Sequence, residues 1–451
     1  MVKRITTRII KKATKATSFW FLITGGCCFF SFTSASKKNW TVLVYMAAYN
    51  DLARFATKNL HQMQQVGSTN SINLLVNYNG TKDGEKKSII YEVEKNNLKV
   101  LQEYIFAKDS VDGGDPQTLI RFCQEVLPAY PADNYALIFW NHGTGILEPI
   151  VRYRTPYLQL FSLNASFHTK KATQSNKHFL PIATYQTQKK GICFDDGTGN
   201  FLTETDLIDA LSTICNGTLH KPFDLLCFDA CLMGMIEIAT SLAPFGRYFV
   251  ASQEVELGWG WNYELMLKPF LIGTIQPKTF GIHIVNAYAK TYNSLDDYAL
   301  SFIGLEKIHL LKSNIHNVAQ LSATLLSSAP PSTFKNIIRL SRNKHFCTHF
   351  DEPSFIDLAH FYQNMLIYSE NYDPKTESNK ETWQELLATL RSGLELIQQI
   401  VLHNKTGKKA PKAHGLSIYF PEQAIHYSYI DSSFAQTTAW LYFLNLYLQG
   451  D

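Results

Sequence analysis

Residues 223–231 read Phe-Asp-Leu-Leu-Cys-Phe-Asp-Ala-Cys, an apolar run of strand length that ends on Asp229 and Cys231. Residues 135–143 read Tyr-Ala-Leu-Ile-Phe-Trp-Asn-His-Gly, a second run of this kind that ends on His142. Continuous apolar runs of this length are typical of strands buried on both faces of a parallel sheet. Because parallel strands end at one edge of their sheet, the histidine and the cysteine can meet there.

Three further apolar runs of strand length alternate with segments of helical periodicity. They are residues 40–48, 72–78 and 248–252. Strands that alternate with helices predict right-handed βαβ units and a mostly parallel sheet covered by helices on both faces. Residues 88–93 and 99–101 add a hairpin. The predicted fold class is therefore α/β.

The chain has 451 residues, more than one ordinary domain. We expect a signal peptide at 1–35, an α/β catalytic domain at 36–265 and a C-terminal helical or mixed module at 266–451. Helical patterns dominate that module, at 279–293, 308–327 and 382–402. Residues 151–190 form a basic insertion without clear periodicity, and insertions of this length usually have a function or act as linkers.

The N-terminus reads as a secretory signal. A basic segment is followed by an apolar stretch at 19–32 and by small residues at 33–36. The stretch is short for a membrane span, which needs about 20 residues. We expect cleavage, with an uncleaved N-terminal anchor as the alternative and no other membrane contact. The protein is then secreted or held in the cell envelope, in a periplasmic or extracellular location.

The net charge of +4 is concentrated at the N-terminus. Six of the 42 Lys and Arg residues lie in the first fifteen positions, and the rest of the chain is close to neutral against 38 acidic residues. No basic field therefore argues for a nucleic-acid partner. The content of 45% hydrophobic and 18% charged residues is that of a globular protein.

Cysteines and oxygen-rich segments give weak signals for disulfides or metals. Six cysteines lie beyond the signal, too sparsely for a disulfide scaffold, and Cys123 and Cys227 sit in apolar runs as expected for buried residues. Residues 345–349 hold two His and one Cys but have no second cluster to complete a zinc site. Residues 195–200 can bind Ca²⁺ or form a plain turn. We expect no metal and no cofactor, with calcium as the alternative.

The pair of His142 and Cys231 suits nucleophilic catalysis. A thiol is mostly protonated at neutral pH and needs a base or a positive field. A helix that starts at Cys231 would favour the thiolate, and His142 can accept the proton. The N–H groups of Gly143 and Cys231 can form an oxyanion hole. The alternatives are a buried structural cysteine and a plain His-Gly turn.

Residues 141–145, Asn-His-Gly-Thr-Gly, and residues 228–234, Phe-Asp-Ala-Cys-Leu-Met-Gly, resemble the clostripain family of cysteine peptidases. That family is related in fold to caspases, gingipains and legumain. Residues 45–52, 251–254 and 415–421 also resemble stretches of the family. The similarity extends from about Trp40 to Pro421, and it implies a caspase-like sheet.

The resemblance implies a dyad of His142 and Cys231 without an essential third member. It also implies cleavage of proteins or peptides after Arg or Lys, with Asp229 at the base of the P1 pocket. An N-cap role is the alternative for Asp229. Members of the family often mature by cutting themselves between the His and the Cys. We expect such zymogen processing after Lys171 or Lys190, whereas a merely solvated loop is the alternative.

Two departures from the family pattern bear on specificity. Tyr49 stands where the family commonly has Asp, and bulky Trp259 lies in a loop, residues 256–261, that can border the substrate pocket. Two other functions stay open. One is the same dyad with another P1 specificity, Asn or Asp. The other is an exported binding or adhesion protein that keeps the fold without turnover.

Overall fold

The computed structural model describes residues 37–147, 191–328, 332–370 and 377–449. The predicted signal peptide and residues 151–190 lie outside this part of the chain. The described residues belong to one compact unit. No helix in the described ranges is long and apolar enough to cross a membrane.

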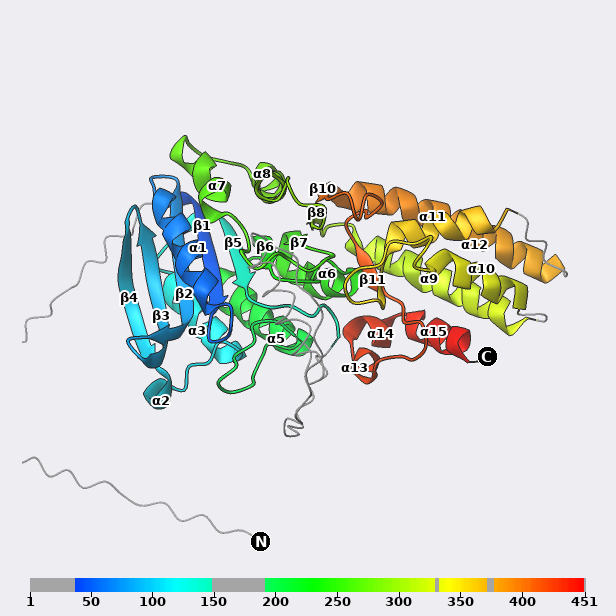
Figure 1. Ribbon diagram of the computed structural model, residues 1–451, viewed down its shortest axis with the longest axis horizontal. Helices are drawn as coiled ribbons and strands as arrows, with labels where there is room; N and C mark the ends of the chain where they lie inside the picture. The colour runs from blue at the N-terminus through cyan, green and yellow to red at the C-terminus, as the bar shows by residue number, and fades with distance from the viewer. Residues whose placement is uncertain (1–36, 148–190, 329–331, 371–376, 450–451) are drawn as a thin grey trace, which may run out of the picture. The chain divides into compact units, whose positions relative to one another are not determined.

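In the described part of the chain, one sheet has nine strands in the order β10-β8-β7-β6-β5-β1-β2-β3-β4 (Figure 1). The strands are β1 (Lys38–Ala47), β2 (Ile72–Lys82), β3 (Glu85–Glu94), β4 (Asn97–Ile105), β5 (Ala132–Trp140), β6 (Phe223–Asp229), β7 (Gly246–Ala251), β8 (Ala299–Gly304) and β10 (Val401–Thr406). Strands β7, β6, β5, β1 and β2 run parallel, and the outer strands on both sides are antiparallel to their neighbours. The predicted mostly parallel sheet is confirmed.

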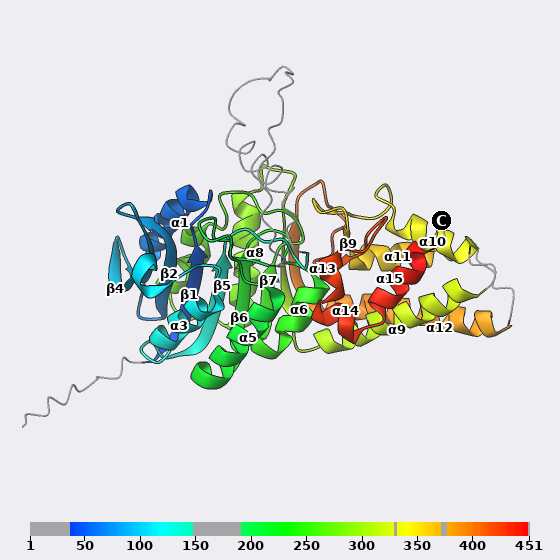
Figure 2. The same ribbon diagram turned by 90° about the horizontal axis from the view of Figure 1, so that it is seen from below.

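Helices cover both faces of this sheet, as predicted (Figures 1 and 2). One face carries α1 (Ala53–Val66), α7 (Tyr263–Leu267) and α8 (Pro277–Thr291), and the other carries α3 (Pro116–Val126), α5 (Glu204–Ile214) and α6 (Ile236–Leu242). Helix α5 begins with a capping box, in which Thr203 and Asp206 exchange hydrogen bonds. Short elements connect the layers: α2 (Phe106–Asp109), η2 (Cys215–Leu219), η3 (Ala243–Phe245) and η4 (Lys268–Leu271).

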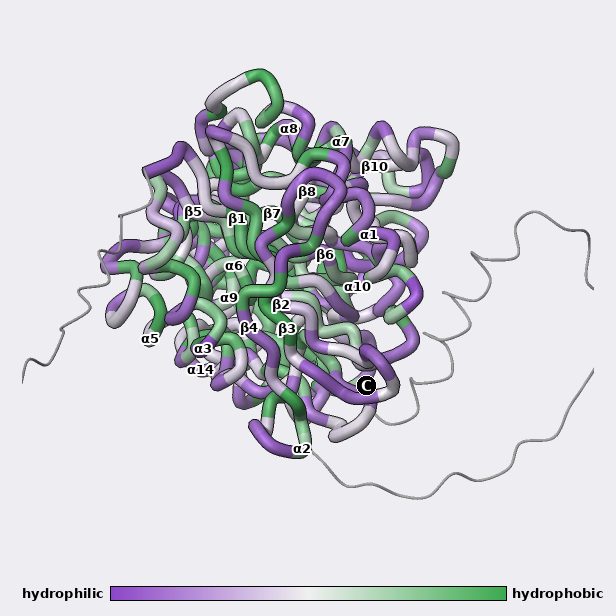
Figure 3. The backbone as a smooth tube through the Cα atoms, turned by 90° about the vertical axis from the view of Figure 1, so that its left-hand side faces the viewer, coloured by the Kyte–Doolittle hydropathy of each residue, from purple (hydrophilic) through white to green (hydrophobic). Residues whose placement is uncertain are grey.

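The centre of the sheet is the hydrophobic core. Every residue of β6 is buried, and β1 is buried from Trp40 to Ala47. Figure 3 shows hydrophobic backbone segments gathered along the central strands such as β1. Cys123 and Cys227 are fully buried, as predicted, and all six cysteines of the described residues are free thiols. Burial on both faces explains why these strands read as continuous apolar runs.

Two strands of the main sheet, β8 and β10, come from beyond residue 265. The expected boundary at that position therefore falls inside the compact unit. The same part of the chain contributes helices that pack on one another near α6 and β10. These are α9 (Ile308–Ser327), α10 (Ser332–Arg342), α11 (Leu358–Tyr368), α12 (Glu377–Ile400) and α15 (Trp440–Leu448). Shorter elements are β9 (Phe355–Asp357), β11 (Ser417–Tyr419), α13 (Tyr427–Ile430) and α14 (Ser433–Thr437).

Helix α6, which follows the cysteine turn, is tied to the C-terminal residues through Glu237. This carboxyl is fully buried and accepts hydrogen bonds from the backbone N–H of Tyr419, at 2.9 Å, and the hydroxyl of Tyr429, at 3.3 Å. The N–H of Ser417 donates to the carbonyl of Gly234 at 2.9 Å. Strand β11 therefore supports the turn behind Cys231.

Burial raises the pKa of Glu237 to about 8, from an ordinary value of 4.5. Between these two values the folded chain keeps a proton that the unfolded chain loses, so stability falls as the pH rises. The slope from this group is at most about 1.4 kcal/mol per pH unit. We expect Glu237→Gln, which carries no titratable group, to lose less stability than the wild type between pH 6 and pH 8.

Denaturant unfolding at the two pH values measures this difference. Glu264→Gln, at a partly exposed acid of α7, serves as the control and should keep the wild-type pH dependence. An identical pH dependence in the wild type and in Glu237→Gln would show that Glu237 is already ionised in the folded protein.

Candidate active site

Two neighbouring strands bring His142 and Cys231 to the same edge of the sheet. Strands β5 and β6 pair in parallel, with Trp140 opposite Asp229. His142 and Cys231 each lie two residues beyond this pair. A side chain at Gly143 would place its Cβ 2.5 Å from the carbonyl oxygen of Cys231. The two loops therefore touch, and this close approach requires glycine.

A carboxylate that the sequence did not predict orients the histidine. Strands β1 and β5 are neighbours in the sheet. The chain continues from β1 to β2 on one side of this pair and from β5 to β6 on the other side. The carboxyl ends of β1 and β5 therefore form the switch point of the strand order, where ligands bind in such folds. Asp51, just after β1, lies 2.7 Å from the Nε2 of His142. Asp51 lies three residues beyond the apolar run at 40–48, and this position was the available signal.

This contact defines which nitrogen of His142 can act as a base. Partial burial opposes ionisation of Asp51, but the hydrogen bond and charge of His142 lower the pKa of its carboxyl. An ionised carboxylate accepts hydrogen bonds and cannot donate them. This contact therefore assigns the proton to Nε2, and in the neutral ring Nδ1 is then the nitrogen without a proton.

Cys231 is buried, with 2% of its surface exposed. The backbone N–H of Glu256 donates to its sulfur at 3.3 Å. Burial raises the pKa of the thiol, and the charge of Glu256 raises it further, so this conformation favours the neutral thiol.

The expected helix start at Cys231 was wrong. Cys231 lies in a turn in which Leu232 has a φ of 62°, and α6 begins at Ile236. The N–H group that supports the sulfur comes instead from the loop after β7.

Asp229 is buried beside Cys231, with 5% of its surface exposed. Its Oδ1 accepts from the N–H of Trp261 at 3.1 Å, and its Oδ2 accepts from the hydroxyl of Tyr263 at 2.8 Å. Burial raises the pKa of this carboxyl to about 6, although both donors oppose the shift. The N-cap alternative is excluded, because the helix after Asp229 begins seven residues later and is capped by Met235.

A small cavity joins these groups. It has a volume of about 20 Å³ and is lined by Asp229, Cys231, Glu256 and the strand end at 140–141, among others. That volume holds about one water molecule, far less than an arginine side chain. Trp259 is not among the lining residues: its side chain is 48% exposed, and the Nζ of Lys58 lies 3.3 Å from its ring centre.

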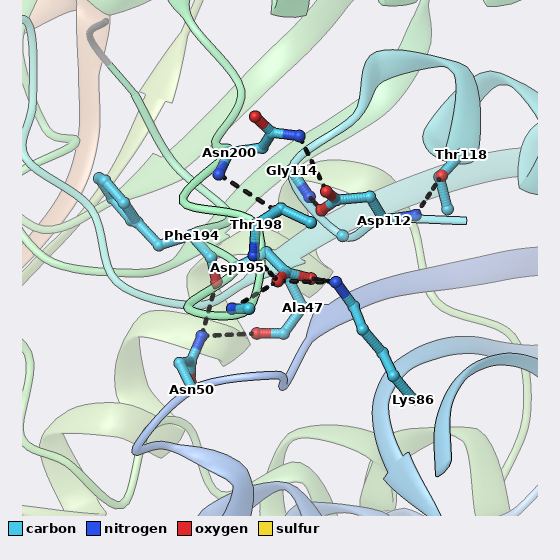
Figure 4. A network of polar contacts seen from close by, with 12 residues as sticks. Ala47, Asn50, Lys86, Asp112, Gly114, Thr118, Phe194, Asp195, Thr198 and Asn200 are labelled. Atoms are coloured by element: carbon cyan, nitrogen blue, oxygen red, sulfur yellow. Dashed lines mark hydrogen bonds and ion pairs between the residues drawn. The ribbon is translucent and has the colours of Figure 1, made fainter. Parts of the chain in front are cut away.

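Residues 191–202 are bonded to the same strand ends. Asn141 accepts from the N–H of Phe194 at 2.8 Å and donates to the carbonyl of Ala47, while Asn50 donates to the carbonyl of Phe194 at 2.7 Å. Gly143 forms an isolated antiparallel bridge with Ile192. Figure 4 shows part of this network. The segment that follows the basic insertion is thus built into the site.

At the calcium candidate, residues 195–200, a lysine side chain from β3 already supplies a positive charge. Lys86 of β3 forms an ion pair with Asp195 at 2.7 Å, and both side chains are largely buried (Figure 4). Asp195 also accepts from the N–H groups of Gly197 and Thr198. No cluster of three or more metal-binding side chains occurs among the described residues. Calcium binding therefore stays the alternative to the expectation that no cofactor is bound.

A sheet of this topology, with a cysteine and a histidine at neighbouring strand ends, defines a caspase-like cysteine peptidase. Comparisons with known proteins agree. The model of the clostripain family, Peptidase_C11, matches residues 44–152 and 180–448. The chain belongs to the clostripain family of cysteine peptidases. It is therefore a hydrolase whose substrates are proteins or peptides.

Individual relatives are distant in sequence. The chain is 24% identical to clostripain of Hathewaya histolytica, over 88% of this chain and 78% of that protein. A secreted C11 cysteine protease of Bacteroides thetaiotaomicron, solved with an irreversible peptide inhibitor, has a TM-score of 0.59 at 19% identity, over 90% of this chain and 99% of the other. An inactive zymogen C11 protease of Parabacteroides distasonis has a TM-score of 0.57 at 19% identity, over 89% and 98%. These structures share the fold.

We expect Asp51→Asn to lower kcat at least about tenfold with little change in KM, because His142 would lose its charged acceptor while substrate contacts stay. Steady-state kinetics on a peptide substrate measures both constants. Asp133→Asn, at an exposed acid paired with Lys37, is the control and should behave like the wild type. An unchanged kcat in Asp51→Asn would show that the contact between Asp51 and His142 only holds the loop in place and does not assist the reaction.

Proposed function

We propose that this protein is an exported endopeptidase that cuts after Arg or Lys, with Cys231 as nucleophile and His142 as general base. The observation that carries the proposal is the buried carboxyl of Asp229 in the cavity beside Cys231. A buried carboxylate stabilises a cationic side chain, and it binds a guanidinium in two places at once.

The reaction follows from these roles. The Nδ1 of His142 takes the thiol proton, and the thiolate attacks the peptide carbonyl carbon. The N–H groups of Gly143 and Cys231 stabilise the negative oxygen of the tetrahedral intermediate. His142 then protonates the leaving amine, which leaves a thioester on Cys231. Water hydrolyses the thioester with His142 as base and regenerates the thiol.

The two alternatives fit less well. An Asp at P1 would face the carboxyl of Asp229 with a like charge, and an Asn would leave that carboxyl without a cation. A binding protein without turnover would have no need for an oriented histidine beside a cysteine. Neither alternative has an observation of its own in its favour.

We further propose that the described conformation is a latent one. The cavity is too small for a basic side chain, the thiol is buried, and its pKa is raised by burial. Cleavage after Lys171 or Lys190, which lie outside the described residues, would start the conversion. The neighbouring segment 191–202 forms hydrogen bonds to both strand ends of the site. A cut upstream of this segment can therefore change the geometry of the site. The N-terminal signal, and a secreted relative, support export.

Cys231→Ala should abolish peptide hydrolysis and leave the chain uncut, because both reactions need the thiolate. A fluorogenic peptide with Arg at P1 reports the first, and mass spectrometry of the purified protein reports the second. Cys215→Ala removes another buried thiol away from the site and should remain active and processed. Hydrolysis by Cys231→Ala at the wild-type rate would contradict the assignment of Cys231 as the nucleophile.

The preference for a positive charge should follow the ionisation of Asp229. Substrates with P1 Arg and P1 citrulline differ in charge but hardly in shape. The pH dependence of the catalytic groups affects both substrates alike, so it cancels in the ratio of their kcat/KM values. The groups that face Asp229 are Glu256 and Tyr263. Since the pKa of Asp229 is about 6, the ratio should be highest above that pH and should fall below it.

Asp229→Asn should lower this Arg-to-citrulline ratio by about 10- to 100-fold and remove its change near pH 6. The measurement is the same pair of substrates across pH 5 to 8, with Asp133→Asn again as the control. A ratio that Asp229→Asn leaves untouched would exclude Asp229 from the P1 pocket.

A further inference from the structure

The loop after β7, residues 252–256, lies alongside the turn that carries Cys231. The turn needs support, because Leu232 has a φ of 62°, in a region that residues other than glycine rarely adopt. Backbone N–H groups of both segments provide this support. They join Leu232 to the carbonyl of Glu254 at 3.2 Å, Gly234 to the carbonyl of Ser252 at 2.7 Å, and Glu256 to the sulfur of Cys231 at 3.3 Å.

A buried amide in the middle of this loop fastens it to residues of the C-terminal part of the chain. Gln253 lies between the two residues whose carbonyls hold the turn, and it is fully buried. Its Nε2 donates to the Oδ2 of Asp357 at 3.0 Å, and its Oε1 accepts from the backbone N–H of Gly415 at 2.8 Å. Both ends of the amide are therefore used, and both partners are distant in the sequence.

Asp357, the N-cap of α11, is the centre of this network. Its carboxylate is fully buried and accepts four hydrogen bonds: from Gln253, from the N–H of His360, and from both the N–H and the Nδ1 of His414. Burial of His414 opposes its protonation, but the hydrogen bond and charge of Asp357 raise its pKa above the ordinary value of 6.5. Protonated His414 then supplies the positive charge that a buried carboxylate needs.

We propose that Gln253, Asp357 and His414 form a clamp that positions Cys231 for attack: the clamp holds the loop after β7, and the loop holds the cysteine turn. Neither Gln253 nor Asp357 is among the residues that line the cavity beside Cys231, so both are positioning residues. This inference rests on the proposed role of Cys231 as nucleophile. It adds that the C-terminal part of the chain determines how well the nucleophile is aligned.

The polar character of the clamp is the argument for positioning. Apolar side chains could join the same surfaces at least as stably, because burying polar and charged groups is costly. Hydrogen bonds, however, fix the direction as well as the distance between their partners, so they specify one place for the loop. Glu256, three residues beyond Gln253, carries this placement to the sulfur of Cys231. A shift of about 1 Å at a reacting group can cost about 100-fold in rate.

The test is kcat per competent active site. An irreversible peptide inhibitor, an acyloxymethyl ketone with Arg at P1, titrates the sites that react, so unfolded or unprocessed chains are not counted. Gln253→Leu removes both hydrogen bonds at similar size and should lower kcat per titrated site at least about tenfold, with less than about threefold change in KM. A residue that only stabilises the fold would lower the number of titrated sites and leave kcat per site unchanged.

A second variant keeps the shape of the side chain. Gln253→Glu still accepts from the N–H of Gly415, but it loses the donor to Asp357 and places two carboxyls together. It should therefore also lower kcat per titrated site, at least about tenfold, measured in the same way.

Asn364→Leu is the matched control. Asn364 is a buried residue of α11 whose amide also makes two hydrogen bonds, but these go to the carbonyls of Ser341 and Phe346 and not to the loop after β7. It should lower stability and keep the wild-type kcat per site. Wild-type kcat per site in both Gln253 variants would overturn the clamp. A wild-type enzyme in which the inhibitor labels a residue other than Cys231 would overturn the proposed nucleophile instead.

Discussion

The parallel pairing of β5 with β6 is the constraint on which the site depends. Because Trp140 lies opposite Asp229, the loops that carry the histidine and the cysteine leave the sheet side by side. A slip of one residue would send every side chain of a strand to the other face. The buried, continuous apolar sequences of both strands oppose such a slip, so the core itself fixes how the loops of His142 and Cys231 lie relative to each other.

The loop that follows β7 adds a buried acid, Glu256, to the lining of the site, together with Leu257 and two glycines. Asp229 and Glu256 share a cavity with a thiol, and each of the three is more than nine-tenths buried. Such a cluster lowers stability unless a cation or a proton compensates it. Burial raises the pKa of both acids, so protonation offsets part of this cost in the described conformation.

The sequence predicted what depends on local pattern. Apolar runs indicated the central strands, the alternation with helices indicated the parallel sheet, and the residues after two runs indicated His142 and Cys231. It did not predict that β8 and β10 join the sheet, because antiparallel pairing between segments about a hundred residues apart leaves no local signature. Asp51 was missed because its partner, His142, is 91 residues away in the sequence, and the start of α6 was misplaced because a turn intervenes.

The hydrogen bonds between strand β11 and the start of α6 have a consequence for truncated forms of the protein. The peptide that follows Cys231 is held by residues almost 200 positions further along the chain, since the N–H groups of Ser417 and Tyr419 donate to Gly234 and Glu237. A premature stop codon well beyond the cysteine would leave all the reactive groups encoded but would remove this support.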